Sequence, residues 1–275
     1  MASVPAEHAD LVGAPHFAHL VTVNRDGSPQ SSPIWIRPDR VSADGAVESI
    51  FFVTGLRYRK ALNIQREPRV ALSIHGADQP YRMLEIVGTA SMKPRTSWDE
   101  LDAISNTYLG TDYPYKGDDP AGWHVTVEID RVTLPNDGEQ PPFVDPPAAG
   151  SDLLSPPHFA HVATVSSTGQ PRSSVVWHRR PEGGGENDIE FWTSAQTLKT
   201  RHLRNNPAVA VSIHDEVDPY RYTELRGQAQ ITAIDGRQMA DELTRLYWKL
   251  DQFPMDVDAM ANSVAIRVET THRVG

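Results

Sequence analysis

Residues 15–35 have the sequence PHFAHLVTVNRDGSPQSSPIW, and residues 157–177 repeat it closely as PHFAHVATVSSTGQPRSSVVW. Further matches follow in the same order, such as EPRVALSIH at residues 67–75 against NPAVAVSIH at residues 206–214. The spacing between the copies is 142 residues early and 139 residues later, so one hairpin differs in length. A repeat of this length predicts two domain-sized units rather than a solenoid of short modules.

Composition limits the class of protein. The chain has 275 residues, of which 39% are hydrophobic and 23% charged, which is typical of a globular protein with two cores. A formal net charge of −10 argues against nucleic acid as a partner. No cysteine is present, which excludes disulfides and thiolate metal sites. With no secretion signal at residues 1–11 and no apolar stretch long enough to span a bilayer, we expect a cytoplasmic protein that does not insert into membranes.

The copies are separated by a segment of different composition. Residues 135–157 are rich in Pro, Gly, Asp and Ala and have little periodicity, as extended linkers do. We therefore expect a first domain at 1–135, a linker at 136–154 and a second domain at 155–275. Because two similar units on one chain can imitate a symmetric dimer, we expect an intramolecular pseudo-dimer. Whether such chains pair again into a homo-oligomer stays open.

Each copy is predicted to contain about six strands and two helices. In copy one, β-prone runs between turn signals predict strands at 17–24, 29–37, 49–54, 70–75, 83–92 and 123–134. One helix is predicted at 56–66, and a second helix begins near Ser97, a candidate N-cap with Glu100 three residues on. We expect a mainly β fold with peripheral helices, built from two small antiparallel barrels that pack together.

The strongest chemical cluster is the run TGLRYRK at residues 54–60. A strand ends at a Thr-Gly turn, and a helix then opens with three cations. Backbone N–H groups at a helix start favour an anion, and these cations would add charge-assisted hydrogen bonds to a phosphate. The three cations are Arg57, Arg59 and Lys60. The alternative is an ordinary basic surface beside Glu48 or Glu67.

Copy two keeps only part of this cluster. Residues 193–199 read TSAQTLK, so Lys199 remains while Gln196 and Leu198 stand where copy one has arginines. One ammonium group is a weaker clamp for phosphate than a lysine with two guanidinium groups. We predict one competent anion site and one degraded site, unless Arg201 or Arg204 compensates.

The strand at 29–37 carries hydroxyls beside large apolar groups. Hydroxyl and backbone groups of Ser31 and Ser32 could hydrogen-bond a planar heterocycle, with Ile34 or Trp35 beside the ring. For Trp35, packing inside the barrel is the simpler interpretation.

Other motifs give no catalytic group and no metal site. His16 and His19 lie three residues apart, and on a strand such positions face opposite sides, which argues against a shared metal ion. The glycine run at 183–185 lacks the Lys-Ser or Lys-Thr of a phosphate loop, and the sequence has no Gly-x-Ser-x-Gly elbow. We assign no residue to covalent or metal-assisted hydrolysis.

The stretch at 19–35, the FVTG before the basic helix start, the EPRVALSIH segment and the Pro-Tyr-Arg of residues 80–82 resemble a known family. It is the pyridoxamine 5'-phosphate oxidase-like FMN-binding split-barrel family, and within it the flavin and deazaflavin (F420)-dependent oxidoreductase branch. The resemblance covers nearly all of both copies. It implies six-stranded split barrels that pair, with a flavin-type cofactor in a groove between them.

The resemblance also implies where such a cofactor binds. Its phosphate would lie on the basic helix start, and copy two would offer only Lys199 there. Its ring system would lie along the second and third predicted strands, whose matching residues are Ser31, Ser32, Pro33, Ile34, Thr54 and Gly55.

The function implied is hydride transfer between a bound cofactor and a small organic substrate. The Pro-Tyr-Arg segment and the basic helix start look more like those of F420 users than of FMN users. An FMN-dependent oxidase or reductase is the first alternative. A non-catalytic carrier of a cofactor or haem is the second, with His272 as the candidate haem ligand.

Overall fold

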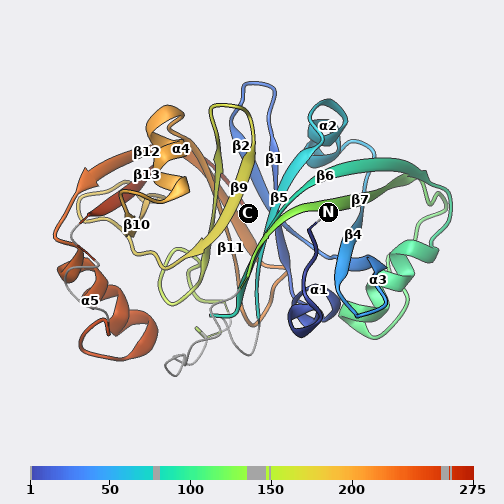
Figure 1. Cartoon of the computed structure of the whole chain (residues 1–275), viewed down its shortest axis with the longest axis horizontal. Helices are drawn as coiled ribbons and strands as arrows, with labels where there is room; N and C mark the ends of the chain where they lie inside the picture. The colour runs from blue at the N-terminus through green and yellow to red at the C-terminus, as the bar shows by residue number, and fades with distance from the viewer. Residues whose placement is uncertain (1, 77–80, 135–146, 149, 255–259, 261) are drawn as a thin grey trace. The chain divides into compact units, whose positions relative to one another are not determined.

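The computed structural model describes residues 2–76, 81–134, 147–148, 150–254, 260 and 262–275 (Figure 1). The chain forms two compact units. One consists of Met1–Asp26 and Pro33–Asn136, and the other consists of Gly27–Ser32 and Asp137–Gly275. The short segment Gly27–Ser32 therefore groups with the second unit, although it lies early in the chain.

The sheet of the first copy has seven strands in the order β2-β1-β5-β6-β7-β4-β3 (Figure 1). Its strands are β1 Ala18–Val23, β2 Pro29–Ile34, β3 Arg37–Val41, β4 Val47–Thr54, β5 Arg69–His75, β6 Met83–Arg95 and β7 Gly122–Thr133. Its helices are η1 Ala6–His8, α1 Asp10–Gly13, α2 Arg59–Arg66 and α3 Asp99–Leu109.

The sheet of the second copy has six strands in the order β10-β13-β12-β11-β8-β9. Its strands are β8 Ala160–Val165, β9 Pro171–Val176, β10 Ile189–Ser194, β11 Ala208–His214, β12 Tyr222–Ala233 and β13 Ser263–Val274. Its helices are α4 Leu198–Asn205 and α5 Gly236–Trp248. The pairs for which a register is given are antiparallel in both sheets, which confirms the predicted mainly β class with peripheral helices.

Three details differ from the sequence prediction. β3 was not predicted; it is an edge strand that contains Pro38, where a missing N–H is tolerated. Helix α2 begins at Arg59 rather than at residue 56, because Tyr58 is still extended. The N-cap of α3 is Trp98, and no side chain caps it, while Ser97 Oγ accepts the N–H of Asp99 at 3.3 Å.

Each unit has its own apolar core. In the first, residues such as Phe52, Leu72 and Ile86 are fully buried on the inner side of the sheet. In the second, Phe191 and Val211 take this role. Burying side chains of this size removes enough apolar surface from water to hold each sheet closed over its core.

A β-bulge recurs at the same place in both units. The register between β6 and β7 shifts between Val87 and Gly88, and the register between β12 and β13 shifts between Arg226 and Gly227. A Cβ atom on Gly88 would lie 2.4 Å from the carbonyl oxygen of Glu128. Only glycine allows the partner backbone to come this close.

The predicted linker lies mostly outside the described residues, which omit 135–146 and 149. Near its end, Leu153 and Leu154 are buried and belong to the second core. Among the helices of the described residues, none combines the length and apolarity that crossing a membrane requires.

Candidate cofactor site

The start of α2 is open to a ligand in the first unit. Its N-cap residue, Tyr58, has an extended backbone and provides no side-chain acceptor for the first N–H groups of the helix. The first intrahelical bond is from the N–H of Leu62 to the carbonyl of Tyr58 at 3.1 Å. The N–H groups that precede it point out of the helix start, where an anion is favoured.

Two of the predicted phosphate ligands have no partner among the residues that the structure describes. Arg57 and Arg59 are exposed, and neither forms a hydrogen bond or an ion pair with a described residue. Lys60 is half-buried, and its Nζ lies 5.9 Å from the centre of the Tyr58 ring. Within the described part of the chain, the helix start thus presents two guanidinium groups without a partner, and an ammonium group beside them.

The carboxylates that could have neutralised this corner are engaged elsewhere. Glu48 Oε2 lies 2.6 Å from Arg40, and Glu67 Oε2 lies 2.6 Å from Arg69. The hydrogen bond from Arg69 holds the pKa of Glu67 below its usual value. Both acids are therefore already paired with other arginines, and neither forms an ion pair with Arg57 among the described residues.

Two hydroxyl groups among the predicted site residues are buried without a partner. Ser32 is 5% exposed and Thr54 is 7% exposed, and neither Oγ atom has a hydrogen-bond partner among the described residues. An unsatisfied buried hydroxyl is costly, so each is a candidate to bond a ligand. Pro33 and Gly55 are half-buried, and Ile34 is part of the core.

Ser31 and Ser32 lie in the segment Gly27–Ser32, which groups with the second unit. The N–H of Ser31 donates to Glu224 Oε1 of that unit at 2.8 Å. Its hydroxyl shares a hydrogen bond of 2.7 Å with the hydroxyl of Ser212. The N–H and the hydroxyl of Ser31 are thus already used within that unit.

Copy two closes the corresponding helix start with its own residues. Thr197 is the N-cap of α4, and its Oγ1 accepts from the N–H of Thr200 at 3.4 Å. The hydroxyl of Thr193, the counterpart of Thr54, lies 3.4 Å from the same Oγ1. Arg204 Nη1 donates to the carbonyl of Ala195 at 2.9 Å, so one of its N–H groups is used within this copy. The two copies therefore differ at this point, with an open helix start in one and a capped helix start in the other.

A family profile described as pyridoxamine 5'-phosphate oxidase matches the chain twice, at residues 4–133 and 147–272. The chain belongs to the pyridoxamine 5'-phosphate oxidase family. Its two matches cover nearly the whole sequence, so this member carries the family domain in tandem. The family relation supports an oxidoreductase of the flavin or deazaflavin type.

Solved structures similar to this family member each cover about half of it. An F420 reductase shares 29% identity over 46% of this chain and 98% of its own, with a TM-score of 0.39. A conserved hypothetical protein from Mycobacterium tuberculosis shares 21% sequence identity in a match that covers 48% of this chain and 84% of that protein, with a TM-score of 0.36. A protein from Listeria innocua that carries the name of a pyridoxamine 5'-phosphate oxidase shares 21% sequence identity with this chain. The match covers 43% of this chain and 86% of the Listeria protein, with a TM-score of 0.33. No functionally curated protein matches the sequence.

The arginines of the repeated Pro-Tyr-Arg segment form ion pairs inside their own units. Arg82 forms two hydrogen bonds with Asp10, of 2.7 and 2.9 Å. Arg221 lies 2.9 Å from the buried carboxylate of Asp215. These contacts support a structural role for both arginines. His272, the candidate haem ligand, is exposed on β13.

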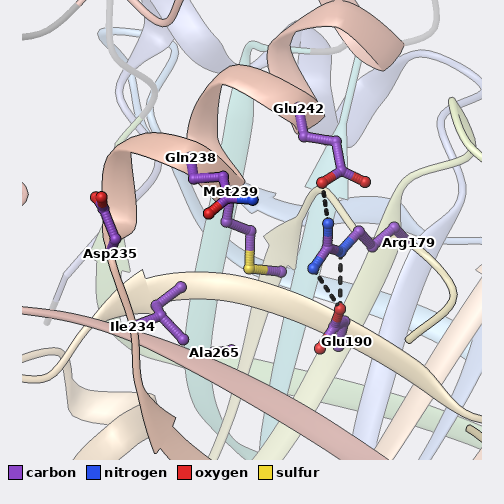
Figure 2. Close-up of a pocket in the computed structure, with 8 residues that line it drawn as sticks. All are labelled: Arg179, Glu190, Ile234, Asp235, Gln238, Met239, Glu242 and Ala265. Atoms are coloured by element: carbon purple, nitrogen blue, oxygen red, sulfur yellow. Dashed lines mark hydrogen bonds and ion pairs between the residues drawn. The ribbon is translucent and has the colours of Figure 1, made fainter. Parts of the chain in front are cut away.

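A pocket of about 240 Å³ opens in the second unit beside α5. Figure 2 shows Arg179 between Glu190 on the strand and Glu242 on the helix, bonded to both. The remaining lining residues are Ile234, Asp235, Gln238, Met239 and Ala265. Because its carboxylates outnumber its cations, the pocket disfavours a phosphate.

A polar cluster that the sequence did not reveal lies at the corresponding place in the first unit. Strand register aligns Ile234 with Arg95 and Ala265 with His124, since β13 and β7 pair with their neighbours in the same way. Arg95 and His124 are 8% and 5% exposed, and burial lowers the pKa of each. In sequence, the run KPRTSW at 93–98 reads as charged surface, so no signal pointed to it.

Proposed function

We propose that this family member is an oxidoreductase that binds one phosphorylated flavin-type cofactor at the open start of α2. Arg57, Arg59 and Lys60 would hold the phosphate. The hydroxyls of Ser32 and Thr54 would hydrogen-bond the rest of the cofactor, with Pro33, Ile34 and Gly55 beside it.

The contrast between the two helix starts carries this proposal. In copy one, Arg57 and Arg59 have no partner among the described residues and no side chain caps the helix. In copy two, Thr197 fills the cap and leucine replaces the second arginine. A protein that only needed a stable helix would gain from the cap in both copies. An open, cationic start in one copy is what an anionic ligand requires.

The chemistry that such a cofactor supplies is transfer of a hydride to or from a small organic substrate. The protein would bind the phosphate of the cofactor and orient its ring system, with the buried hydroxyls of Ser32 and Thr54 directed at the cofactor. Holding two reactants at reacting distance is a large contribution to rate by itself. No residue is assigned as general acid or base, since Arg82 and Arg221 are engaged in ion pairs.

We favour F420 over FMN as the cofactor, because the Pro-Tyr-Arg segment and the basic helix start resemble those of F420 users. FMN is the alternative. Bound FMN absorbs at about 450 nm and the deazaflavin at shorter wavelength, so the spectrum of the loaded protein separates them. We also keep the expectation of a cytoplasmic protein that acts on a small molecule. Its net charge of −10 disfavours nucleic acid as a partner.

Calorimetric titration with F420 and with FMN tests the proposal directly. We expect saturable binding of one of them with a stoichiometry near one per chain. Two equivalent sites, or no binding of either cofactor, would contradict it. If a cofactor binds but hydride transfer to a panel of electron-poor substrates is absent, the carrier alternative gains support. A Soret band on adding haem would favour haem as the cargo.

A further inference from the structure

The pocket beside α5 lies in the second unit and shares no residue with the proposed cofactor site (Figure 2). Helix α5 contributes Gln238, Met239 and Glu242 to its wall, while Glu190 comes from β10 and Ala265 from β13. The volume is about 240 Å³. Pockets for drug-sized ligands measure roughly 300–1,000 Å³, so this one suits a smaller molecule.

Part of the pocket wall is apolar and well ordered by its neighbours. Met239 and Ala265 are 4% and 8% exposed, and Ile234 is half-buried. Ile234 directly follows β12, and its N–H donates to the carbonyl of Ser263 at 3.3 Å, which holds it beside the start of β13. A ligand with an apolar body would gain affinity by covering these side chains.

The polar part of the wall carries more negative than positive charge. Among the described lining residues the acids are Glu190, Glu242 and Asp235, and Arg179 is the one cation. Arg179 forms an ion pair with Glu190 at 2.7 Å and a second with Glu242 (Figure 2). One guanidinium cannot neutralise three carboxylates, so an excess of negative charge remains at the pocket.

Both glutamates keep one oxygen that no described residue engages. The bonds from Arg179 reach Oε1 of Glu190 and Oε2 of Glu242, which leaves the other oxygen of each carboxylate without a partner in the described part of the chain. A carboxylate oxygen accepts hydrogen bonds and donates none. The complementary ligand group is therefore a positively charged donor, and an ammonium group combines its charge with three donors.

At the corresponding place in the first unit, two aromatic rings pack together. Glu190 corresponds to Phe51, since each lies three residues before the matched threonine of its copy. Phe51 stacks on His124, the counterpart of Ala265, with ring centres 4.9 Å apart, and both rings are buried. The second unit has a carboxylate and a methyl group instead of the two rings. The same two differences thus make room for a ligand and give the place its negative charge.

We propose that this pocket binds a small organic cation, namely a primary amine with a short apolar body. The ammonium group donates to Glu190 and Glu242, whose carboxylates Arg179 holds in place. The apolar body packs against Met239 and Ala265. The net charge of −10 on the whole chain also attracts a cation. This site goes beyond the proposed cofactor site and does not depend on it, since none of its residues belongs to the start of α2.

Calorimetric titration of the full chain without cofactor tests the site. The probes are benzylammonium, benzyl alcohol and benzoate, which share a phenyl ring and differ in charge. We expect saturable binding of benzylammonium with a Kd below about 1 mM, and no saturable binding of the other two in that range. Methylammonium, which lacks the apolar body, is expected to bind at least about tenfold more weakly.

Two variants assign the binding to this pocket. Glu242→Gln keeps the size of the side chain and removes one charge, and Glu182→Gln is the matched control, because Glu182 is an exposed acid of the same unit that does not line the pocket. The Glu242 side chain is 40% exposed and thus partly screened, so we expect Glu242→Gln to raise the Kd for benzylammonium about three- to tenfold. Glu182→Gln should change it less than about twofold. Ala265→Phe places a ring in the pocket and is expected to abolish binding.

Three results would overturn the proposal. Benzyl alcohol that binds as tightly as benzylammonium would show that the pocket does not select for charge. Equal affinity of wild type, Glu242→Gln and Ala265→Phe would place the binding elsewhere, and the lack of any saturable binding of benzylammonium would remove its basis. The Arg57→Ala/Lys60→Ala variant is expected to bind benzylammonium as wild type does, so this proposal and the proposed function fail separately.

Discussion

The hydroxyl of Tyr247 donates a hydrogen bond of 2.7 Å to the carbonyl oxygen of His158. It also accepts the N–H of His178 at 3.1 Å, so one hydroxyl joins α5 to the backbone on either side of the β8–β9 hairpin. In the first unit Tyr108 makes the same bond to His16, also at 2.7 Å. Each tyrosine stacks on the tryptophan that follows the hairpin, with ring centres 5.1 Å apart. The repeated tyrosine thus fixes α3 in the first copy and α5 in the second copy to their sheets.

Replacing Tyr247 with phenylalanine is expected to destabilise the protein more than the same change at Tyr108. Tyr247 is fully buried, and the change leaves an unpaired carbonyl and an unpaired N–H in the core. We expect a loss of about 1–3 kcal/mol in the free energy of unfolding for Tyr247→Phe. Tyr108 is only half-buried, so water can replace part of its bonds. Urea unfolding of both variants measures the difference, and equal losses would contradict this expectation.

Removing two cations from the open helix start is expected to abolish tight cofactor binding. Each charge-assisted hydrogen bond contributes about 1.5–3 kcal/mol, so Arg57→Ala/Lys60→Ala should raise the Kd by at least about a hundredfold. Lys199→Ala is the matched control, because it removes the one cation that copy two keeps at this position. Calorimetry with the cofactor that binds wild type is the measurement. Similar losses at the two places would show that both helix starts bind the phosphate.

The cap of α4 gives a test of the difference between the copies. Thr197→Ala removes the side-chain acceptor for the N–H of Thr200, and we expect it to cost about 1 kcal/mol of stability. Tyr58→Thr places the same capping group in copy one. It is expected to stabilise α2 and to weaken cofactor binding, because the new hydroxyl competes with the ligand for the same N–H groups. A stabilised variant with unchanged affinity would show that these groups do not face the ligand.

Stability should fall with decreasing pH partly because of His178. Burial, the main cause, lowers the pKa of this fully buried imidazole to about 3. Between about pH 6.5 and pH 3 the unfolded chain therefore binds a proton that the folded chain does not. Its contribution is present above pH 6.5 and is lost as the pH falls, by about 1.4 kcal/mol per pH unit.

The variant His178→Ile tests this directly, because copy one has Ile36 at the corresponding position. Urea unfolding at pH 7, 6 and 5 should show a shallower loss of stability for the variant than for wild type. Other buried histidines that do not interact with His178, such as His124, titrate in both proteins and cancel in the comparison. Parallel pH profiles would show that His178 takes up its proton in the folded state.

The strands were predictable because most are β-prone runs bounded by strong turn signals, such as the Arg-Asp-Gly-Ser after β1. β3 was missed because its sequence, RPDRV, is charged and contains a proline, and it is ordered by pairing with β4. Helix α2 starts late because Tyr58 stays extended, a choice that local propensity at residues 56–58 does not reveal.

The candidate site was predictable only in part. The three cations at residues 57–60 stand next to each other, so their charge was visible in the sequence. Arg57 lacks a partner among the described residues because the nearby acid Glu48 forms an ion pair with Arg40 instead. The sequence alone does not indicate which charged residues pair after folding. Arg95 gave no signal, because its burial results from the pairing of β6 with the glycine that begins β7.

The paired bulges at Gly88 and Gly227 have a consequence for how such a chain can change length. At each bulge the opposite strand has one extra residue, Asp130 on β7 and Thr271 on β13. Because side chains of a strand alternate between the two faces of the sheet, the extra residue exchanges the faces of all residues that follow it on that strand. Losing Asp130 would turn the outward Arg131 toward the interior. We therefore expect insertions to be tolerated at the hairpins, and one hairpin does differ by three residues between the copies. Within the paired strands, an insertion would change the register, which is the same in both copies.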